Sequence, residues 1–278
     1  MTAGALTVAD ALRRARALGV ERLDAQRLLA HVLARPRSWL AAHPQAVPDA
    51  TQAAALLAAL ERRAAGEPLA YVLGTQEFHG LLLQVNADVL VPRPDTEVLV
   101  DWALELLAGA LAHIANPEVV DLGTGSGAIA LAVKHAHPAA AMLATDVSAA
   151  ALEVARANAA QLGLDVALLP SAWWAELADR HFHLVLANPP YIAGGDPHLA
   201  ALRHEPLLAL TPGGDGLDAL RQIIGGAPDQ LEPGGWLLLE HGYDQADAVR
   251  RLLAQHGLSG VETRFDLGGR ERCTGARR

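Results

Sequence analysis

Alternation between short apolar segments and helical segments constrains the fold of this chain more than any other feature of its sequence. Segments suited to strands lie at residues 117–122, 140–146, 166–169, 183–187 and 235–240, and segments with helical periodicity lie among them at 127–137, 148–162, 216–231 and 243–256. Strands separated by helices of this length predict parallel βαβ units, and hence an α/β doubly wound sheet. Residues 261–274 have no helix after them, which predicts one or two closing strands in an antiparallel edge hairpin.

Length and composition indicate a folded chain of about two domains. Of its 278 residues 51% are apolar and 19% charged, which suits a buried core and not disorder. The net charge of -9, with Lys134 as the sole lysine, disfavours nucleic acid as a partner. The single Cys273 and the lack of a leader sequence predict a reducing, cytoplasmic location. The longest apolar stretch, 102–115, is shorter than the roughly 20 residues of a membrane span.

The first 75 residues predict a separate helical domain, because their apolar residues recur at helical spacing. We expect one helix capped by Thr7 and stopped by Gly19, one from Asp24 to Pro36, and one over 51–65.

A second change of pattern follows this domain. A Gly80 turn between short apolar runs at 76–85 predicts a β-hairpin. We therefore expect three parts, which are a helical domain over 1–75, a hairpin linker over 76–94 and an α/β domain over 95–278.

A glycine-rich segment between a predicted strand and a predicted helix indicates a nucleotide-like ligand. The sequence Asp121-Leu122-Gly123-Thr124-Gly125-Ser126-Gly127 allows a sharp turn and a close approach to a ligand, and the next helix offers unpaired N–H groups. Asp146 ends the following strand, where a carboxylate can accept hydrogen bonds from both ribose hydroxyls.

Two cofactors fit this loop. With Ala128 in the last position, the segment also satisfies the G-x-G-x-x-G/A pattern of nicotinamide enzymes. Asp121, two residues before Gly123, favours S-adenosylmethionine, because an acidic side chain suits a sulfonium and an amino group better than a pyrophosphate. The loop alone leaves both cofactors open.

The sequence Asn188-Pro189-Pro190-Tyr191 follows a buried strand, at the edge where open α/β sheets bind ligands. Two successive prolines fix an extended backbone and remove two N–H donors, which leaves carbonyl acceptors. The Asn188 side-chain oxygen and the Pro189 carbonyl can each accept one N–H of a planar amino group, and Tyr191 can stack on it. We therefore predict methyl transfer to an amide or exocyclic amine, driven by placement and without a strong base.

In this order the glycine loop, Asp146 and the Asn-Pro-Pro-Tyr sequence resemble the class I S-adenosylmethionine-dependent methyltransferases that act on planar amino groups. Within that class the chain resembles the HemK/PrmC family, the protein-glutamine N5-methyltransferases of peptide chain release factors. Further marks of the family lie along nearly the whole chain, at Tyr71-Val72-Leu73-Gly74, Glu77-Phe78-His79-Gly80, Val91-Pro92-Arg93-Pro94-Asp95-Thr96-Glu97, His204-Glu205-Pro206, Ala209-Leu210 and Glu240-His241-Gly242. The resemblance implies a class I methyltransferase sheet (Rossmann-like) with an antiparallel terminal strand.

The resemblance also implies a role for each motif. The residues expected to bind S-adenosylmethionine are Asp121, Gly123, Thr124, Gly125, Ser126, Gly127, Asp146 at the ribose, Trp173 beside the adenine and Asn188 at the edge of the pocket. Asn188, Pro189, Pro190 and Tyr191 would hold the glutamine amide of the Gly-Gly-Gln loop of a class 1 release factor, which the helical domain would help to dock. Ala172 stands where relatives usually carry an Asp that accepts from the adenine amino group, so this contact is expected to be absent.

Some residues have structural explanations beside functional ones. Arg93 and Glu97 either pair at the pocket rim or belong to a proline-fixed helix start that Asp95 caps. A spacing that suits metal ligands occurs in two pairs of histidines, His135 with His137 and His181 with His183. No carboxylate or thiol cluster accompanies them, so we expect no metal site.

Three functions are compatible with these motifs. The first is methylation of release-factor glutamine, and the second is methylation of exocyclic amines on DNA or RNA bases. The third is a protein that binds a translation partner without turnover. The acidic charge balance argues against the second function, and the intact Asn-Pro-Pro-Tyr sequence argues against the third.

Overall fold

The computed structural model describes residues 6–278, and the chain divides into two compact units between Gly74 and Thr75. Residues 1–5, where the predicted helical domain begins, lie outside the described residues. Each unit contains its own cluster of buried apolar side chains.

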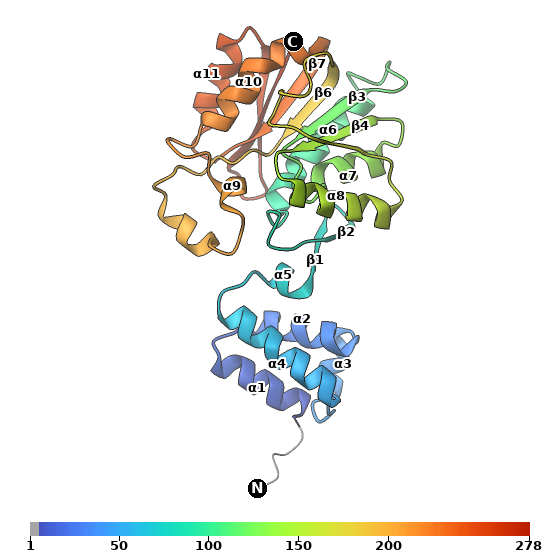
Figure 1. Ribbon diagram of the computed structural model, residues 1–278, viewed down its shortest axis with the longest axis vertical. Coiled ribbons are helices and arrows are strands. Elements are labelled where there is room, and N and C mark those ends of the chain that lie inside the picture. The colour runs from blue at the N-terminus through green and yellow to red at the C-terminus, as the bar shows by residue number, and fades with distance from the viewer. Residues whose placement is uncertain (1–5) are drawn as a thin grey trace. The chain divides into compact units, whose positions relative to one another are not determined.

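The first unit is built from helices (Figure 1). These are α1 (Val8–Ala17), α2 (Arg22–Leu33), α3 (Arg37–Ala42), α4 (Ala50–Ala64) and α5 (Leu69–Leu73). The three predicted helices correspond to α1, α2 and α4. The short helices α3 and α5 were not predicted, because Pro36 and Pro68 were interpreted only as helix ends. Each proline is the N-cap residue of the next helix, where its missing N–H costs no helical hydrogen bond.

Capping interactions fix where two of these helices begin. The predicted cap of α1 is confirmed, since the Asp10 N–H donates to Thr7 Oγ1 and the Thr7 N–H donates to the Asp10 carboxylate, both at 3.1 Å. Asp49 and Gln52 form the same reciprocal pair at α4, which begins at Ala50, one residue before the predicted start. The apolar faces of the helices then pack together around buried residues such as Leu56.

The second unit begins with the predicted hairpin. Strands β1 (Thr75–Phe78) and β2 (Leu81–Gln84) pair antiparallel around a turn at Gly80. The Gln84 N–H donates to Asn158 Oδ1 at 2.7 Å, and Asn158 Nδ2 donates to the Gln84 carbonyl at 3.0 Å. Because Asn158 lies in α8 (Ala149–Leu162), these hydrogen bonds hold the hairpin against this helix of the same unit.

A seven-stranded sheet forms the centre of this unit, in the order β5-β4-β3-β6-β7-β9-β8. Its strands are β3 (Glu118–Leu122), β4 (Ala141–Asp146), β5 (Ala167–Pro170), β6 (Phe182–Ala187), β7 (Leu231–Glu240), β8 (Ser259–Phe265) and β9 (Glu271–Arg277). Strands β3 to β7 are parallel, whereas β9 runs antiparallel to both β7 and β8. The predicted doubly wound sheet with an antiparallel closing hairpin is confirmed.

Helices cover both faces of the sheet (Figure 1). One face carries α6 (Glu97–Ala108), α7 (Ala128–Ala136) and α8, and the other carries α10 (Asp218–Gln230) and α11 (Ala246–Gln255). Shorter turns of helix lie in the connecting segments, at η1 (Pro94–Thr96), η2 (Pro197–Leu202) and α9 (Leu207–Leu210). Over residues 6–278, none of the helices combines the length and apolar character needed to span a membrane.

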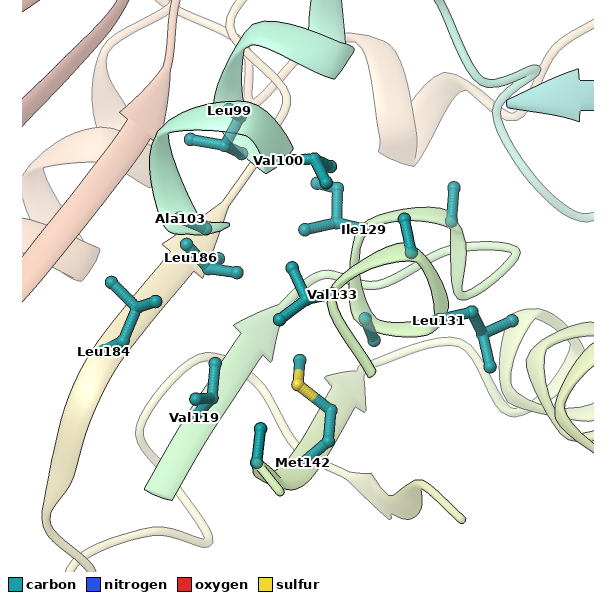
Figure 2. Packing of buried hydrophobic residues seen from close by; sticks show 14 of the residues in the cluster. Leu99, Val100, Ala103, Val119, Ile129, Leu131, Val133, Met142, Leu184 and Leu186 are labelled. Carbon is teal, nitrogen blue, oxygen red and sulfur yellow. The ribbon is translucent and has the colours of Figure 1, made fainter. Parts of the chain in front are cut away.

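Successive strand residues point to opposite faces, and this alternation builds two cores. Val119 and Leu184 pack toward α6 and α7, as Figure 2 shows, together with Val133 of α7. Their neighbours Val120 and Val185 pack on the other face, toward α10 and α11. Because both faces of the central strands are buried, the strands hold a fixed position relative to the helices, and the loops at their carboxyl ends are held in place.

Candidate active site

A cavity of about 250 Å³ lies at the carboxyl edge of the sheet, beside the point between β3 and β6 where the strand order reverses. Its walls are formed by residues within the segments 88–96, 123–129, 146–151, 171–173 and 188–209. The structure therefore brings together the glycine loop, Asp146, Trp173 and Asn188, which are far apart in the sequence.

The glycine loop turns back over the end of β3. The N–H groups of Gly123 and Thr124 both donate to the Thr145 carbonyl, at 2.9 and 2.8 Å. Gly123, Gly125 and Gly127 all have positive φ, between 56° and 84°, which other residues rarely adopt. A Cβ added at Gly125 would meet no atom within 4 Å, because this glycine borders the cavity. Gly127 does not border the cavity, and its Cβ would lie 2.9 Å from Leu131 Cδ1, so it serves close packing of α7.

Asp121 lies beneath the glycine loop and does not border the cavity. Its side chain is fully buried, and Thr124 Oγ1 donates to its carboxylate at 2.5 Å. Burial raises the pKa of Asp121 to about 7, while the hydrogen bonds from the Thr124 hydroxyl and the Ala130 N–H act in the opposite direction. Asp121 therefore holds the loop through Thr124, which does line the cavity.

Asp146 ends β4 and borders the cavity. Its carboxylate accepts the N–H of Gly125 at 2.9 Å and that of Ser148 at 2.9 Å, and these hydrogen bonds fix its position. Burial raises the pKa of Asp146 above its ordinary value of 3.8, against the effect of those N–H groups. A carboxylate has about four acceptor positions, so two hydrogen bonds leave capacity for ribose hydroxyls.

Trp173 and Ala172 also line the cavity. Trp173 adopts a φ of 51°, a left-handed conformation that is uncommon for a large residue. Its ring lies against Gly123, since a Cβ on that glycine would be 3.3 Å from Trp173 Cζ3. The conformation thus places a flat apolar surface next to the glycine loop.

The Asn-Pro-Pro-Tyr segment follows β6 directly. Asn188 and Pro190 line the cavity, and Asn188 Nδ2 donates to Thr96 Oγ1 at 3.2 Å. Pro189 is buried and does not border the cavity. Tyr191 does not border it either, because its ring packs against the core on the α10 face and its hydroxyl donates to Glu240 Oε1 at 3.1 Å. Its predicted stacking on the substrate stays a prediction.

Glu240 ends β7 and is 1% exposed. Burial raises the pKa of Glu240, whereas the hydrogen bond from the Tyr191 hydroxyl, the nearby Thr96 hydroxyl and the positive charge of Arg272 act in the opposite direction. The same burial, together with the negative charge of Glu240, raises the pKa of Tyr191, so its hydroxyl keeps its proton. Glu240 is thus a buried acceptor for the Tyr191 hydroxyl, and its Oε2 has no hydrogen-bond partner among the described residues.

The predictions for the Pro-Arg-Pro-Asp-Thr-Glu segment are corrected by the structure. Arg93 pairs with Glu205 and not with Glu97, and Glu205 also accepts the Val91 N–H at 3.1 Å. Glu97 instead accepts the N–H of His79 at 3.0 Å. The predicted cap is wrong, because η1 has no side-chain cap. Its Asp95 lies 3.2 Å from Arg272 Nη2 instead.

Sequence reasoning missed several residues of the site, above all Thr96 and Glu205. Both belong to motifs that mark the family resemblance, but their partners are 92 and 112 residues away along the chain. His183, one of the histidines whose spacing would suit metal ligands, accepts the Glu118 N–H at 3.0 Å. Across residues 6–278, no cluster of three or more His, Cys, Asp or Glu side chains is arranged to hold a metal ion.

Comparison with known proteins identifies the family. A model described as the PrmC N-terminal domain matches residues 5–74, and one described as the methyltransferase small domain matches residues 96–257. The release factor glutamine methyltransferase of Bordetella pertussis is 51% identical over 92% of this chain and 95% of its own length. The chain belongs to the PrmC/HemK family of release factor glutamine methyltransferases. A PrmC/HemK relative from Burkholderia pseudomallei is 48% identical over 97% of this chain and 96% of its own.

Solved structures agree on the fold of the PrmC/HemK chain. The ribosomal protein L11 methylase of Lactobacillus delbrueckii has a TM-score of 0.50 at 23% identity, covering 70% of this chain and 85% of that one. A 16S rRNA N2 G1207 methyltransferase of T. thermophilus has a TM-score of 0.54 at 19% identity, covering 73% and 49%. At this level of identity the likeness concerns the class I methyltransferase fold alone.

The residues around the cavity fit S-adenosylmethionine, the methyl donor of this family. Gly125 leaves open space that any side chain would fill, and Asp146 offers free acceptor positions. Trp173 adds a flat apolar wall, and the amino end of α7 lies beside the loop, where its N–H groups suit a carboxylate. Membership of this family settles the choice of cofactor that the glycine loop alone left open, and the residues around the cavity agree with it.

Proposed function

We propose that this protein transfers a methyl group from S-adenosylmethionine to the side-chain amide nitrogen of the glutamine in the Gly-Gly-Gln loop of class 1 peptide chain release factors. The observation that carries the proposal is the place of Asn188, at the end of β6 and on the wall of the cavity that the glycine loop also lines. Relatives at 48–51% identity are named for the same modification of release factors.

The cofactor would be held by residues that line the cavity. S-adenosylmethionine, when bound, supplies an electrophilic methyl group on a sulfonium. Asp146 would accept hydrogen bonds from the ribose hydroxyls, and Trp173 would lie beside the adenine. Gly123, Thr124, Gly125 and Ser126 would line the rest of the molecule. Ala172 offers no side-chain acceptor for the adenine amino group, so recognition there rests on the apolar wall.

Asn188 and Pro189 would act on the substrate amide. An amide nitrogen is a weak nucleophile, because its lone pair is delocalised into the carbonyl. Asn188 lines the cavity, and its Oδ1 would accept one N–H of the amide. Pro189 does not border the cavity, so its carbonyl would accept the other N–H only from an amide that reaches past Asn188. These acceptors would stabilise the positive charge that grows on the nitrogen during transfer and would aim the nitrogen along the line of attack. The nitrogen starts with two N–H bonds and ends with one, so one proton leaves to solvent and no strong base is needed.

The helical first unit would dock the release factor. Its residues 5–74 match the PrmC N-terminal domain, and its fold contains none of the cavity residues. A separate unit of this kind can hold the body of a protein substrate while the loop reaches the cavity. Because translation termination takes place in the cytoplasm, we also propose that the protein acts there.

The test is to incubate the full chain with methyl-labelled S-adenosylmethionine and one of three acceptors. These are a class 1 release factor, the same factor with Gln→Ala in its Gly-Gly-Gln loop, and ribosomal RNA. We expect label on the unmodified factor alone. Label on the RNA alone, or equal label on both forms of the factor, would reject the proposal.

A further inference from the structure

Two neighbouring leucines of the short helix α9 are exposed beside the cavity. Leu207 is 64% exposed and Leu208 is 62% exposed, and Leu208 also borders the cavity. Single apolar side chains on a surface need no explanation, but adjacent ones at the rim of a pocket mark a surface that a partner covers. We call Leu207 and Leu208 the α9 ledge.

The segment that carries the α9 ledge is held in two places. The Ile192 N–H donates to the Leu210 carbonyl at 3.0 Å, which closes residues 192–210 into a loop directly after the Asn-Pro-Pro-Tyr segment. Within this loop the Glu205 side chain is buried and forms an ion pair with Arg93. The ledge begins two residues after Glu205, so its position is set before any substrate binds.

The same contacts place the ledge at the Asn188 end of the cavity. Asn188 Nδ2 donates to Thr96 Oγ1 at 3.2 Å, and the Thr96 N–H donates to the Arg93 carbonyl at 3.1 Å. Arg93 in turn pairs with Glu205, three residues before Leu208. A continuous series of contacts therefore joins the ledge to the residue that we propose to hold the substrate amide.

Chain connectivity indicates what would cover this ledge. With the glutamine amide at Asn188, the residues on either side of that glutamine must leave through the mouth of the cavity, because consecutive Cα atoms are only about 3.8 Å apart. They would then lie over the rim. Val147 is also apolar, exposed and on the cavity wall, but it follows Asp146 directly and so lies at the end that we propose for the ribose.

We infer that the α9 ledge is the docking surface for the residues that flank the target glutamine of the release factor. This inference rests on the proposed function and adds to it a substrate contact made by the second unit itself. Covering an exposed leucine with a partner is worth on the order of a tenfold change in affinity. Glu205 acts here as a positioning residue, because its pairing with Arg93 holds the ledge at the cavity.

The first test changes both leucines together, as Leu207→Ser with Leu208→Ser in the full chain. We expect the KM for a class 1 release factor to rise on the order of 10-fold, whereas the Kd for S-adenosylmethionine should stay within about twofold. Leu267→Ser is the matched control, because Leu267 is exposed after β8 and does not border the cavity, and its KM should equal that of wild type. A wild-type KM in the double variant, or a Kd that rises as much as the KM, would overturn the inference.

The second test identifies the occupant of the ledge. The photo-reactive residue benzoylphenylalanine is placed at position 207, or at position 267 as the control, and the protein is irradiated with the release factor. We expect crosslinks from position 207 alone, to factor residues within about five positions of the glutamine, since five residues span at most roughly 18 Å. Crosslinks to remote parts of the factor, crosslinks to a second copy of this chain, or none at all would each contradict the inference. A wild-type enzyme that leaves the glutamine unmethylated would count against the proposed function instead.

Discussion

At the scale of single residues, the candidate site uses polar groups that are held before any ligand arrives. Asp146 is fixed by two backbone N–H groups, and the amide of Asn188 is fixed by Thr96. Hydrogen bonds of this kind lower the reorganisation needed when charge develops during a reaction. Loss of one such group should therefore affect turnover and binding differently, according to where that group acts.

Asn188→Ala should lower kcat far more than it weakens cofactor binding. The variant removes an acceptor that acts on the substrate nitrogen during transfer, and the expected loss is on the order of 10²-fold to 10³-fold. Single-turnover methylation measures the rate, and calorimetric titration with S-adenosylmethionine measures the Kd. Asn116→Ala, at an exposed position before β3, serves as the control. Equal losses in rate and affinity would mean that Asn188 binds the cofactor and does not act on the substrate.

Asp121 should make the stability of the protein depend on pH. Its folded-state pKa of about 7 lies above the ordinary 3.8, so the folded chain binds this proton more tightly than the unfolded chain. Stability is then lost as pH rises from about 4 to about 7, by up to about 1.4 kcal/mol per pH unit, and the loss is complete above that range. Asp121→Asn, which does not titrate, should therefore gain stability relative to wild type between pH 5 and pH 8. Urea unfolding of both proteins at pH 5 and pH 8 checks this. The prediction would be refuted if the free energies of unfolding of variant and wild type differed by the same amount at both pH values.

At the scale of elements, the alternation of strands and helices was sufficient to predict the sheet, because a parallel sheet buries both faces of its strands. The helical unit was harder to predict. Pro36 and Pro68 end one helix and also precede the next, and a single sequence indicates only the first effect. Pro228, in contrast, ends no helix. It lies inside α10, in a segment that was predicted as one continuous helix.

The site was predictable in its motifs and not in its connections. The glycine loop and the Asn-Pro-Pro-Tyr segment each follow a strand, and strand ends of a doubly wound sheet meet at one edge. The Arg93–Glu205 pair could not be predicted, since it depends on how the segment after β6 folds back toward the segment before α6. Glu97 is four residues from Arg93 and looked like the partner, but no helix is present at Arg93 to bring the two together.

Two glycines allow the effect of backbone strain on stability to be separated from the loss of space for the cofactor. Gly125 has a φ of 56° and Gly163, at the end of α8, has a φ of 65°, and a Cβ at either would meet no atom within 4 Å. Gly125→Ala and Gly163→Ala should each lower the free energy of unfolding by about 1 kcal/mol. Only Gly125→Ala should raise the Kd for S-adenosylmethionine, because its methyl group would enter the cavity. Thermal unfolding and titration separate the two effects, and similar Kd values for both variants would contradict this account.

At the scale of the whole molecule, two units with separate cores divide the work that we propose. All residues that line the cavity lie in the second unit, whereas the first has its own core around Leu56 and Leu60. A defect in the first core should therefore act on docking and not on chemistry.

Leu56→Ala should destabilise the first unit by about 2–5 kcal/mol, the usual cost of truncating a buried leucine. We expect a separate unfolding transition at lower temperature and a higher KM for the release factor. The Kd for S-adenosylmethionine should be unchanged. Scanning calorimetry and steady-state kinetics measure these effects, with Leu23→Ala, at an exposed position, as the control. A KM equal to that of wild type while the first unit is unfolded would exclude docking by this unit.

The last strand of the sheet lies inside it. Because β9 pairs with β7 on one side and β8 on the other, residues 271–277 must be in place before either neighbour gains its partner. A nascent chain that has emerged from the ribosome only as far as residue 270 leaves β7 with a bare edge and Glu240 without Arg272. The sheet of this unit consequently cannot be completed until residues 271–277 are available, and both β7 and β8 wait on this one segment for their final partner.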